Sequence, residues 1–240
     1  MVLRDDSEKR LLDAMAMEKE YRKLQTDWEA KTAFGYHEKL QAFGFADTVE
    51  YELAKAEHYI SNTTPVVKYV NQSTVMPEIF KAIEDNIVTV LIVTPDVEVA
   101  YIGNDTIIDV DYCKRKRIPV VTIDRGGGVI VSNPADIAFV YVTKYTGLLP
   151  VFVDKAINYL KQLTPDVKKD KNDILVNGYK VSAAGMVAEY ACVIHFSLVV
   201  DIEKITAISK KEMVKEPKGL SELANVTKQN IIDEALSWLP

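Results

Sequence analysis

The sequence predicts an α+β fold: a mixed, largely antiparallel sheet with flanking helices, preceded by an N-terminal helical extension. Beyond about residue 66, segments with the composition of strands outnumber helical segments. The dipeptide Asn177-Gly178 separates two such segments and is a strong hairpin signal. Several hairpins, rather than a regular alternation of strands and helices, indicate the α+β class.

The chain is expected to divide into a helical extension over residues 1–65 and a main domain over residues 66–240. Polar residues at positions 5–7 can cap a first helix, and a second helix is expected over about 47–60. Large side chains recur at three-four spacing along the first helix: Ala14, Met17, Tyr21, Leu24 and Trp28. This stripe fits a partner helix, but packing within its own domain is favoured, because two heptads are too few for a coiled coil.

Apolar runs place the strands and helices of the main domain. Strands are expected at 88–93, 97–102, 120–123, 137–143, 174–176, 179–182 and 192–200, with a turn at 94–96 between the first two. Helices are expected at 107–117, 149–163 and 221–238.

Composition narrows the range of functions. The 240 residues are 48% hydrophobic and 27% charged, enough for a packed core. The net charge of -6 argues against a nucleic-acid-binding face, so the basic runs at 114–117 and 168–171 are interpreted as solvated turns or helix ends. The N-terminus lacks an apolar signal segment and every apolar run is strand-sized, so a cytoplasmic protein without a membrane partner is expected.

The two cysteines, Cys113 and Cys192, form no CxxC pair and no metal-binding spacing. They allow one disulfide, although a reduced protein is favoured. No cluster of histidine and carboxylate residues suggests a catalytic metal.

A glycine-rich run follows one predicted strand: Asp124-Arg125-Gly126-Gly127-Gly128. Glycines let a ligand approach the main chain closely, and their exposed N–H groups can hold a phosphate or carboxylate. The Arg125 guanidinium can add a bidentate clamp. The alternative is a glycine-rich bulge that only bends a sheet, and the run alone does not decide between the two.

This run resembles the "DRGGxVTYHGPGQ" signature of octanoyltransferases and overlaps the "RRxSGGGxVxHD" loop of lipoate-protein ligases. Residues 99–105, which include Gly103 and Asn104, are similar to the "VVIGRNQN" turn of the same family. The chain is therefore identified as a divergent member of the lipoate-protein ligase and octanoyltransferase (biotin/lipoate A/B protein ligase) family. The resemblance implies that the turn and the glycine run line an acyl pocket, and that in a ligase the glycine run also wraps the acyl-adenylate.

Residues 172–185 resemble the "NDLxVNGRKIAGxA" segment, which puts the essential lysine of the family on Lys180. Its implied roles are to stabilise charge on a phosphate or carbonyl oxygen, or to orient the attacking amine. Two later stretches, 191–201 and 218–223, resemble the next family segments, "FHHGTLLLNVD" and "KGVxSLxxxV". We therefore expect the glycine run and Lys180 to form one site, with Asp124 as a further candidate.

Two departures from the family pattern bear on chemistry. Ser132 and Asn133 stand where the family has a histidine after the glycine loop; Asn133 can keep a hydrogen bond, but neither side chain can shuttle protons. His195 is the only histidine in the matched region, and it fits a partly buried strand position as well as a catalytic one. Neither cysteine lies where an octanoyltransferase places its nucleophile, which disfavours a covalent acyl-enzyme.

The leading hypothesis is ATP-dependent attachment of lipoate, or a related medium-chain acyl group such as octanoate, to a lysine of a lipoyl-carrier domain. ATP with Mg²⁺ and lipoate are then the expected cofactor and substrate. The second hypothesis is a catalytically degenerate homologue that acts as a ligand-binding or protein-interaction module, and the third is a cysteine-dependent octanoyltransferase. A biotin-type ligase ranks lower, because its "GRGRxGRxW" motif is absent.

Overall fold

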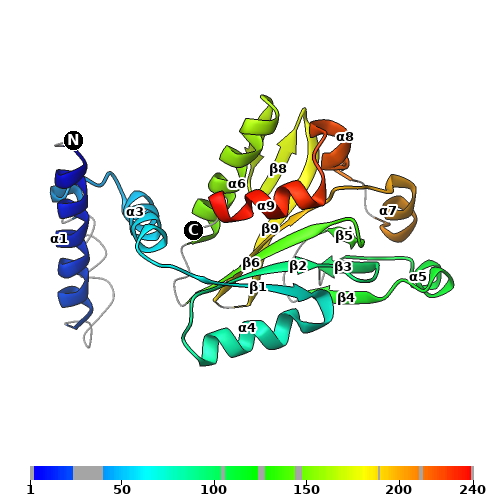
Figure 1. The fold of residues 1–240 in the computed structure, drawn as a ribbon, viewed down its shortest axis with the longest axis horizontal. Coiled ribbons are helices and arrows are strands. Elements are labelled where there is room, and N and C mark those ends of the chain that lie inside the picture. The colour runs from blue at the N-terminus through cyan, green and yellow to red at the C-terminus, as the bar shows by residue number, and fades with distance from the viewer. Residues whose placement is uncertain are drawn as a thin grey trace. The chain divides into compact units, whose positions relative to one another are not determined.

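The computed structural model describes residues 3–23, 40–103, 106–123, 128–143, 148–188, 190–210 and 213–238. The chain divides into two compact units, Met1–Thr63 and Thr64–Pro240, and each is described by itself (Figure 1). Among the described helices, none combines the length and the apolar character needed to cross a bilayer.

Among the described residues of the first unit are two long helices, α1 (Leu3–Lys23) and α3 (Thr48–Ser61). Its small core is formed by Leu11, Ala14, Leu40 and Tyr51. Met17 packs against this core, so this part of the α1 stripe packs within its own unit, as expected. Leu24 and Trp28 lie outside the described residues, and so do the contacts of Tyr21.

A buried polar contact also joins α1 to α3. The Nζ atom of Lys55 lies 2.8 Å from Oε2 of Glu18, and the hydroxyl of Tyr51 donates to the same oxygen at 2.8 Å. All three side chains are almost fully buried, so these contacts offset part of the cost of burying their polar groups.

The second unit is built on a seven-stranded sheet. In spatial order its strands are β1 (Val66–Asn71), β2 (Thr89–Thr94), β6 (Ile137–Val142), β10 (Ala191–Phe196), β9 (Tyr179–Ala188), β8 (Asp173–Val176) and β7 (Val167–Asp170). Only the β1–β2 pair is parallel, and the other five pairs are antiparallel. The expected α+β class with a largely antiparallel sheet is confirmed.

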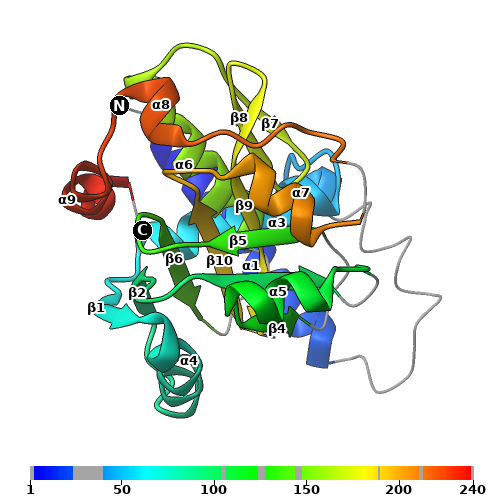
Figure 2. The same ribbon diagram turned by 90° about the vertical axis from the view of Figure 1, so that its right-hand side faces the viewer.

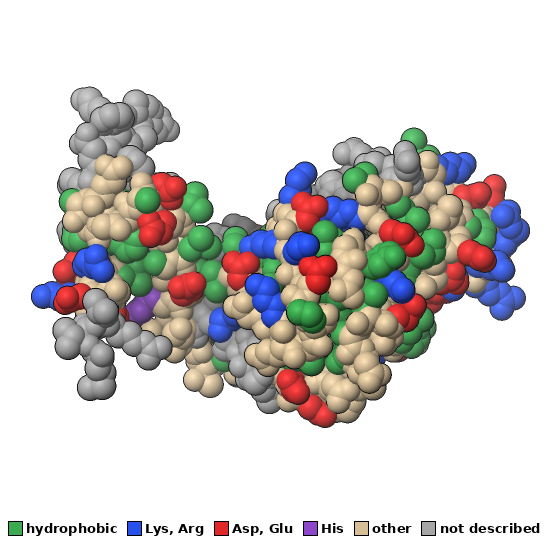
Figure 3. Space-filling view, turned by 90° about the horizontal axis from the view of Figure 1, so that it is seen from above, with side chains coloured by type: hydrophobic (Ala, Val, Ile, Leu, Met, Phe, Trp, Pro, Cys, Tyr) green, Lys and Arg blue, Asp and Glu red, His purple; other side chains and the backbone are tan. Residues whose placement is uncertain are grey.

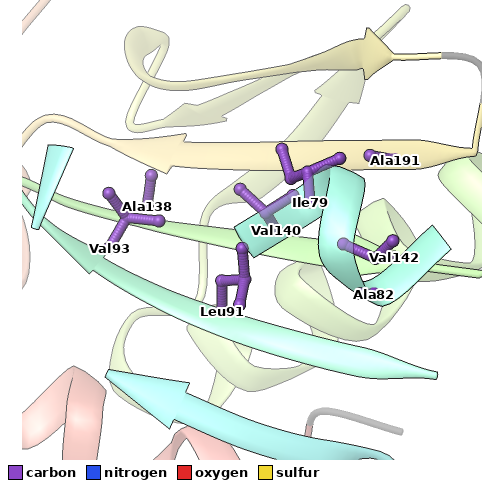
Figure 4. Close-up of a cluster of buried hydrophobic side chains, with 8 residues drawn as sticks. All are labelled: Ile79, Ala82, Leu91, Val93, Ala138, Val140, Val142 and Ala191. Atoms are coloured by element: carbon purple, nitrogen blue, oxygen red, sulfur yellow. The ribbon is translucent and has the colours of Figure 1, made fainter. Parts of the chain in front are cut away.

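Helices cover both faces of the central strands. On one face, the short η2 (Gln72–Thr74) leads into α4 (Val75–Glu84), which packs on a cluster of aliphatic side chains (Figure 4). On the other face lies α6 (Leu149–Leu163), whose Phe152 ring is 6.0 Å from the Tyr141 ring. All six residues of β6 are buried, as expected for a strand covered on both sides.

A second, three-stranded sheet has the order β4 (Val120–Ile123), β3 (Val99–Gly103), β5 (Val129–Ser132). Two short helices, α5 (Val110–Lys116) and α7 (Ile202–Ile208), pack beside it (Figure 2). Each is capped by an aspartate: Asp109 accepts from the backbone N–H of Tyr112, and Asp201 from that of Lys204.

The turn expected at residues 94–96 does lie between two strands, but these strands do not pair with each other. The two apolar runs do form strands, but β2 belongs to the large sheet and β3 to the small one. Both edges of β2 are already paired, one with β1 and the other with β6. The short connection therefore carries the chain from one sheet to the other.

The hairpin expected at Asn177-Gly178 is confirmed. Both residues have positive φ, 51° and 82°, as a type I′ turn requires. The turn joins β8 to β9 and puts Lys180 opposite Leu175, next to a shift in the register between the two strands.

The C-terminal helical region is divided rather than continuous. Helix α8 (Leu220–Ala224) ends at Asn225 in the left-handed conformation, with φ 48°, and α9 (Lys228–Trp238) follows. Asparagine tolerates this conformation better than most residues. The helix expected over 221–238 is therefore correct except for a break at residues 225–227.

The basic run at 114–117 forms the last turn of α5 and its left-handed cap at Arg117, and all four side chains are exposed. In Figure 3, Lys and Arg side chains gather at the right-hand end, where Figure 1 places α5. The expected solvated helix end is confirmed. In the other run, Lys168 pairs with Asp166 and Lys169 with Asp154 on the surface.

Candidate active site

Lys180 lies near the start of β9, and its backbone is held from both sides. On one side it pairs with Leu175 of β8. On the other side its N–H donates to the carbonyl of Glu216 at 2.9 Å, while the N–H of Lys218 donates to the Lys180 carbonyl at 3.0 Å. The segment around Pro217 thus runs parallel to β9 at this point and fixes the base of the lysine side chain.

The Lys180 ammonium is one member of a cluster of four charged groups. Its Nζ lies 2.9 Å from Oδ1 of Asp173, and the other oxygen of that carboxylate lies 2.8 Å from Nζ of Lys215. Lys215 also contacts Asp170, at 2.7 Å. The Lys180 side chain is 31% exposed, so an anion in solvent can reach it.

The two central members of this cluster have shifted pKa values. Partial burial by itself would raise the pKa of Asp173, but the hydrogen bonds and charges of Lys215 and Lys180 outweigh it and lower the pKa. Partial burial acts to lower the pKa of Lys215, and its bonds to Asp170 and Asp173 turn this into a net rise. Both shifts favour the ionised form of the group concerned.

Two of the expected glycines meet at the small sheet. The N–H of Gly103, at the end of β3, donates to the carbonyl of Gly128 at 3.3 Å. Gly128 is exposed, and a Cβ placed there would meet no atom within 4 Å. The open space beside Gly128 leaves the backbone of this residue accessible. Asn104, Asp124, Arg125, Gly126 and Gly127 lie outside the described residues.

Among the described residues, no hydrogen bond or ion pair joins Lys180 to Gly103 or Gly128. A single site that contains both the glycine run and Lys180 therefore stays a prediction.

His195, on β10, lies against two buried polar side chains. Its Nε2 atom is 3.2 Å from Oγ of Ser132 and 3.5 Å from Oδ2 of Asp136. Its Nδ1 atom is buried and has no hydrogen-bond partner within the described part of the chain. A serine protease triad places serine and aspartate on opposite ring nitrogens, whereas here both face Nε2, so the cluster does not form such a triad.

Asn133 lies in the turn between β5 and β6, and this turn uses its polar atoms. Its side chain donates to Asp136 and to the carbonyl of Val199, and accepts from the N–H of Ala135. Asp136 is fully buried and also accepts from the backbone N–H of Leu198. A substrate-binding role for Asn133 would therefore compete with contacts that shape this turn.

Gly219, in the segment that resembles "KGVxSLxxxV", is needed for a close approach of two backbones. A Cβ at this position would lie 2.4 Å from the carbonyl oxygen of Leu198. The N–H of the next residue, Leu220, donates to the Ser197 carbonyl at 2.9 Å. This contact anchors the segment after Lys218, and so supports the strand-like stretch beside Lys180.

Neither cysteine is placed to act as a nucleophile. Both are buried, and burial raises the pKa of Cys113 and raises that of Cys192 to about 12. Because the thiolate is the reactive species, a raised pKa disfavours nucleophilic attack by either thiol at neutral pH.

The structure adds residues that the sequence did not single out. Asp173 belongs to the motif around Lys180, but its partner Lys215 lies 42 residues further along the chain in a stretch without a recognisable pattern. Asp136 likewise gave no signal, because a lone aspartate after a strand usually indicates only a turn. In the part of the chain that the structure describes, no three His, Cys, Asp or Glu side chains are grouped so as to hold a metal ion.

Comparison with solved structures gives several relatives of the same fold. The putative lipoate protein ligase from T. acidophilum with bound lipoic acid aligns with a TM-score of 0.58 and 16% identity, over 73% of this chain and 84% of that one. P. falciparum LipL1 in complex with lipoate aligns with a TM-score of 0.59 and 16% identity, over 73% of this chain and 61% of that one. A lipoate-protein ligase A bound with ATP aligns with a TM-score of 0.59 and 16% identity, over 73% of this chain and 84% of that one.

Among curated proteins, no sequence matches the chain significantly. A family description does match: the lipoyl protein ligase A/B catalytic domain, over residues 69–233. This match covers most of the second unit and includes every strand except the start of β1. The chain therefore belongs to the family of lipoyl protein ligase A/B catalytic domains, the lipoate-protein ligase and octanoyltransferase family that its motifs resemble.

Proposed function

We propose that this protein attaches lipoate, or a related medium-chain acyl group, to a lysine of a lipoyl-carrier domain at the expense of ATP. The observation that supports this best is the contact between two family-like segments far apart in sequence. Lys180, in the segment that resembles "NDLxVNGRKIAGxA", forms backbone hydrogen bonds with Glu216 and Lys218. Lys218 is the first residue of the segment that resembles "KGVxSLxxxV". A lysine inside this arrangement has a partly exposed ammonium.

The named ligands and partners of structural relatives support the choice of substrates. The T. acidophilum protein was solved with lipoic acid, and another relative was solved with ATP. A further structure, with a TM-score of 0.59, is described as part of an archaeal lipoylation system with its E2 lipoyl domain. We propose that the present chain binds the same three kinds of molecule: lipoate, ATP and a lipoyl domain.

The proposed reaction has two steps. An oxygen of the acyl carboxylate attacks the α-phosphorus of ATP, and pyrophosphate leaves to give an acyl-adenylate. The amine of the acceptor lysine then attacks the acyl carbon, AMP leaves, and the amine loses a proton. Mg²⁺ would enter bound to the phosphates of ATP. Lys180 would oppose negative charge on the α-phosphate and the carbonyl oxygen, and the N–H groups of the glycine run would hold the adenylate.

The test is incubation of the purified protein with ATP, Mg²⁺, lipoate or octanoate, and a set of lipoyl domains. Mass spectrometry should detect acylation of one acceptor lysine, and pyrophosphate release should require the acid. A preparation that forms no adenylate and modifies no acceptor in the set would refute the proposal.

A second candidate function is a non-catalytic module that binds an acyl ligand or a protein partner. Ser132 stands where the family has its histidine, and the Lys180 ammonium is already paired with Asp173; both observations favour this alternative. It predicts a thermal shift with lipoate or ATP but no turnover. A cysteine-dependent octanoyltransferase gains no such support, because both thiols are buried.

A further inference from the structure

We infer that Lys215 is a positioning residue: it shares the carboxylate of Asp173 and so lets Lys180 leave that carboxylate for an anionic ligand. The inference rests on the proposed function of Lys180 as the group that meets the adenylate. It assigns a role to a residue outside every motif in the sequence.

The geometry divides the Asp173 carboxylate between two ammonium groups. The Oδ1 atom lies 2.9 Å from Nζ of Lys180, and the Oδ2 atom lies 2.8 Å from Nζ of Lys215. While Lys215 occupies Oδ2, Lys180 holds only one oxygen. Without Lys215, both oxygens would be available to Lys180, and the pair would be harder to separate.

Lys215 is held independently of Lys180. Its ammonium also contacts a carboxylate oxygen of Asp170, at 2.7 Å, and the carbonyl of the same residue, at 3.5 Å. Asp170 ends β7, directly before the turn into β8, so the lysine is anchored to the β7–β8 hairpin. It can therefore stay in place when Lys180 moves.

Charge balance gives the energetic reason. Two lysines and two aspartates make the cluster neutral. If Lys180 moves to a phosphate, Lys215 still neutralises one of the two remaining carboxylates. In the absence of Lys215, the same movement would leave Asp173 and Asp170 without a cation in the cluster. The Asp173 side chain is only 23% exposed, and leaving a carboxylate unpaired in such a place is costly.

Steady-state kinetics of adenylate formation test this in the full-length protein. Lys215→Met should lower kcat/KM about two- to fivefold, the size expected for one partly exposed ion pair, and Lys215→Arg should retain most of the activity. The decisive variant is the double change Asp173→Asn with Lys215→Met. It should be faster than Lys215→Met alone, because the carboxylate that retains Lys180 is gone.

A matched control separates this effect from the general loss of a surface lysine. Lys169 lies in the same hairpin and pairs with Asp154 at 2.7 Å, so Lys169→Met should leave the rate unchanged. If Lys215 had only a structural role, the double variant would be as slow as Lys215→Met or slower, and that result would overturn the inference.

A second measurement needs no catalytic activity. Limited acetylation with acetic anhydride, read by mass spectrometry, reports how often Lys180 is free of its partner. The rate at Lys180 should increase in the order Lys215→Met, wild type, Asp173→Asn. Equal or faster acetylation in Lys215→Met than in wild type would overturn the inference, even if Asp173→Asn failed to fold. A wild type without ligase activity would refute the proposed function, while the acetylation order would still decide the role of Lys215.

Discussion

The Nε2 atom of His195 lies 3.2 Å from the Oγ atom of Ser132, and the two residues belong to different sheets. Ser132 ends β5 of the small sheet, and His195 lies on β10 of the large one. Ser132 is also the residue that stands where the resemblance places the family histidine. The imidazole of His195 thus lies beside the position from which the family histidine is missing, although it comes from another strand.

The His195 contact is expected to stabilise the second unit. His195→Ala would leave Ser132 and the buried Asp136 without the imidazole, at a cost of about 1–3 kcal/mol. Urea unfolding at neutral pH measures this cost. Because Ser132 shares the interaction, Ser132→Ala combined with His195→Ala should cost less than the sum of the single changes. Strict additivity would show that the two side chains do not interact.

Lys180→Ala is expected to lower acyl transfer at least tenfold, because an uncompensated charge in the transition state costs about 1.4 kcal/mol or more. The fold should persist, since the backbone bonds at this position do not need the side chain. Lys180→Arg keeps the charge but changes its geometry, and should retain partial activity. The measurement is acceptor acylation by mass spectrometry beside a thermal melt. Full acyl transfer by Lys180→Ala would show that the Lys180 ammonium does not stabilise charge in this reaction.

The buried thiols are expected to resist labelling. With a pKa of about 12 for Cys192, only about one thiol in ten thousand is ionised at pH 8. Iodoacetamide should modify neither Cys113 nor Cys192 in the native protein, and both after denaturation in urea. Cys113→Ser and Cys192→Ser should keep acyl transfer. Loss of transfer in a well-folded serine variant would revive a covalent acyl-enzyme.

Much of the fold could be predicted because local signals agree with tertiary packing. The helix expected over 149–163 has the observed bounds, and Asn177-Gly178 specifies its turn chemically. The sequence could not show, for a physical reason, that the two strands joined at residues 94–96 lie in different sheets. A short turn between two apolar runs shows that the chain bends, but strand pairing depends on which edges are already occupied. The two edges of β2 are occupied by β1, which precedes it by way of α4, and by β6, which follows much later in the chain.

The candidate site was predicted only where a motif marked it. Lys180 and Gly103 were named from sequence segments, whereas Lys215 and Asp136 act through contacts with residues 42 and 62 positions away. Long-range ion pairs and buried hydrogen bonds leave no periodic pattern in the sequence. The contact of His195 with Ser132 is of the same kind, since it spans 63 residues and two sheets.

Gly219→Ala is expected to destabilise the second unit and to lower ligase activity together. The added Cβ would lie 2.4 Å from the Leu198 carbonyl oxygen, and backbone must move to relieve this overlap, at a cost of about 1–3 kcal/mol. The movement would shift the segment that pairs with Lys180. Gly178→Ala is a useful comparison: its Cβ meets no atom within 4 Å, so its cost comes only from positive φ. An equal loss of activity in both variants would argue against a link through residues 216–218.

The charged cluster around Asp173 should make stability depend on pH in a defined direction. Because the pKa of Asp173 is lowered in the folded protein, its stabilisation is fully present above the unfolded value of about 3.9 and is lost as pH falls through the lowered folded value. Lys215 has a raised pKa in the folded protein. Its contribution to the free energy of unfolding is therefore fully present below about pH 10.4 and is lost as pH rises through the raised folded value. Urea unfolding at pH 7 should therefore give wild type a free energy of unfolding up to about 1 kcal/mol greater than that of Asp173→Asn. That difference should shrink below about pH 4. A difference that stayed constant between pH 7 and pH 3 would show that the carboxylate charge does not stabilise the fold.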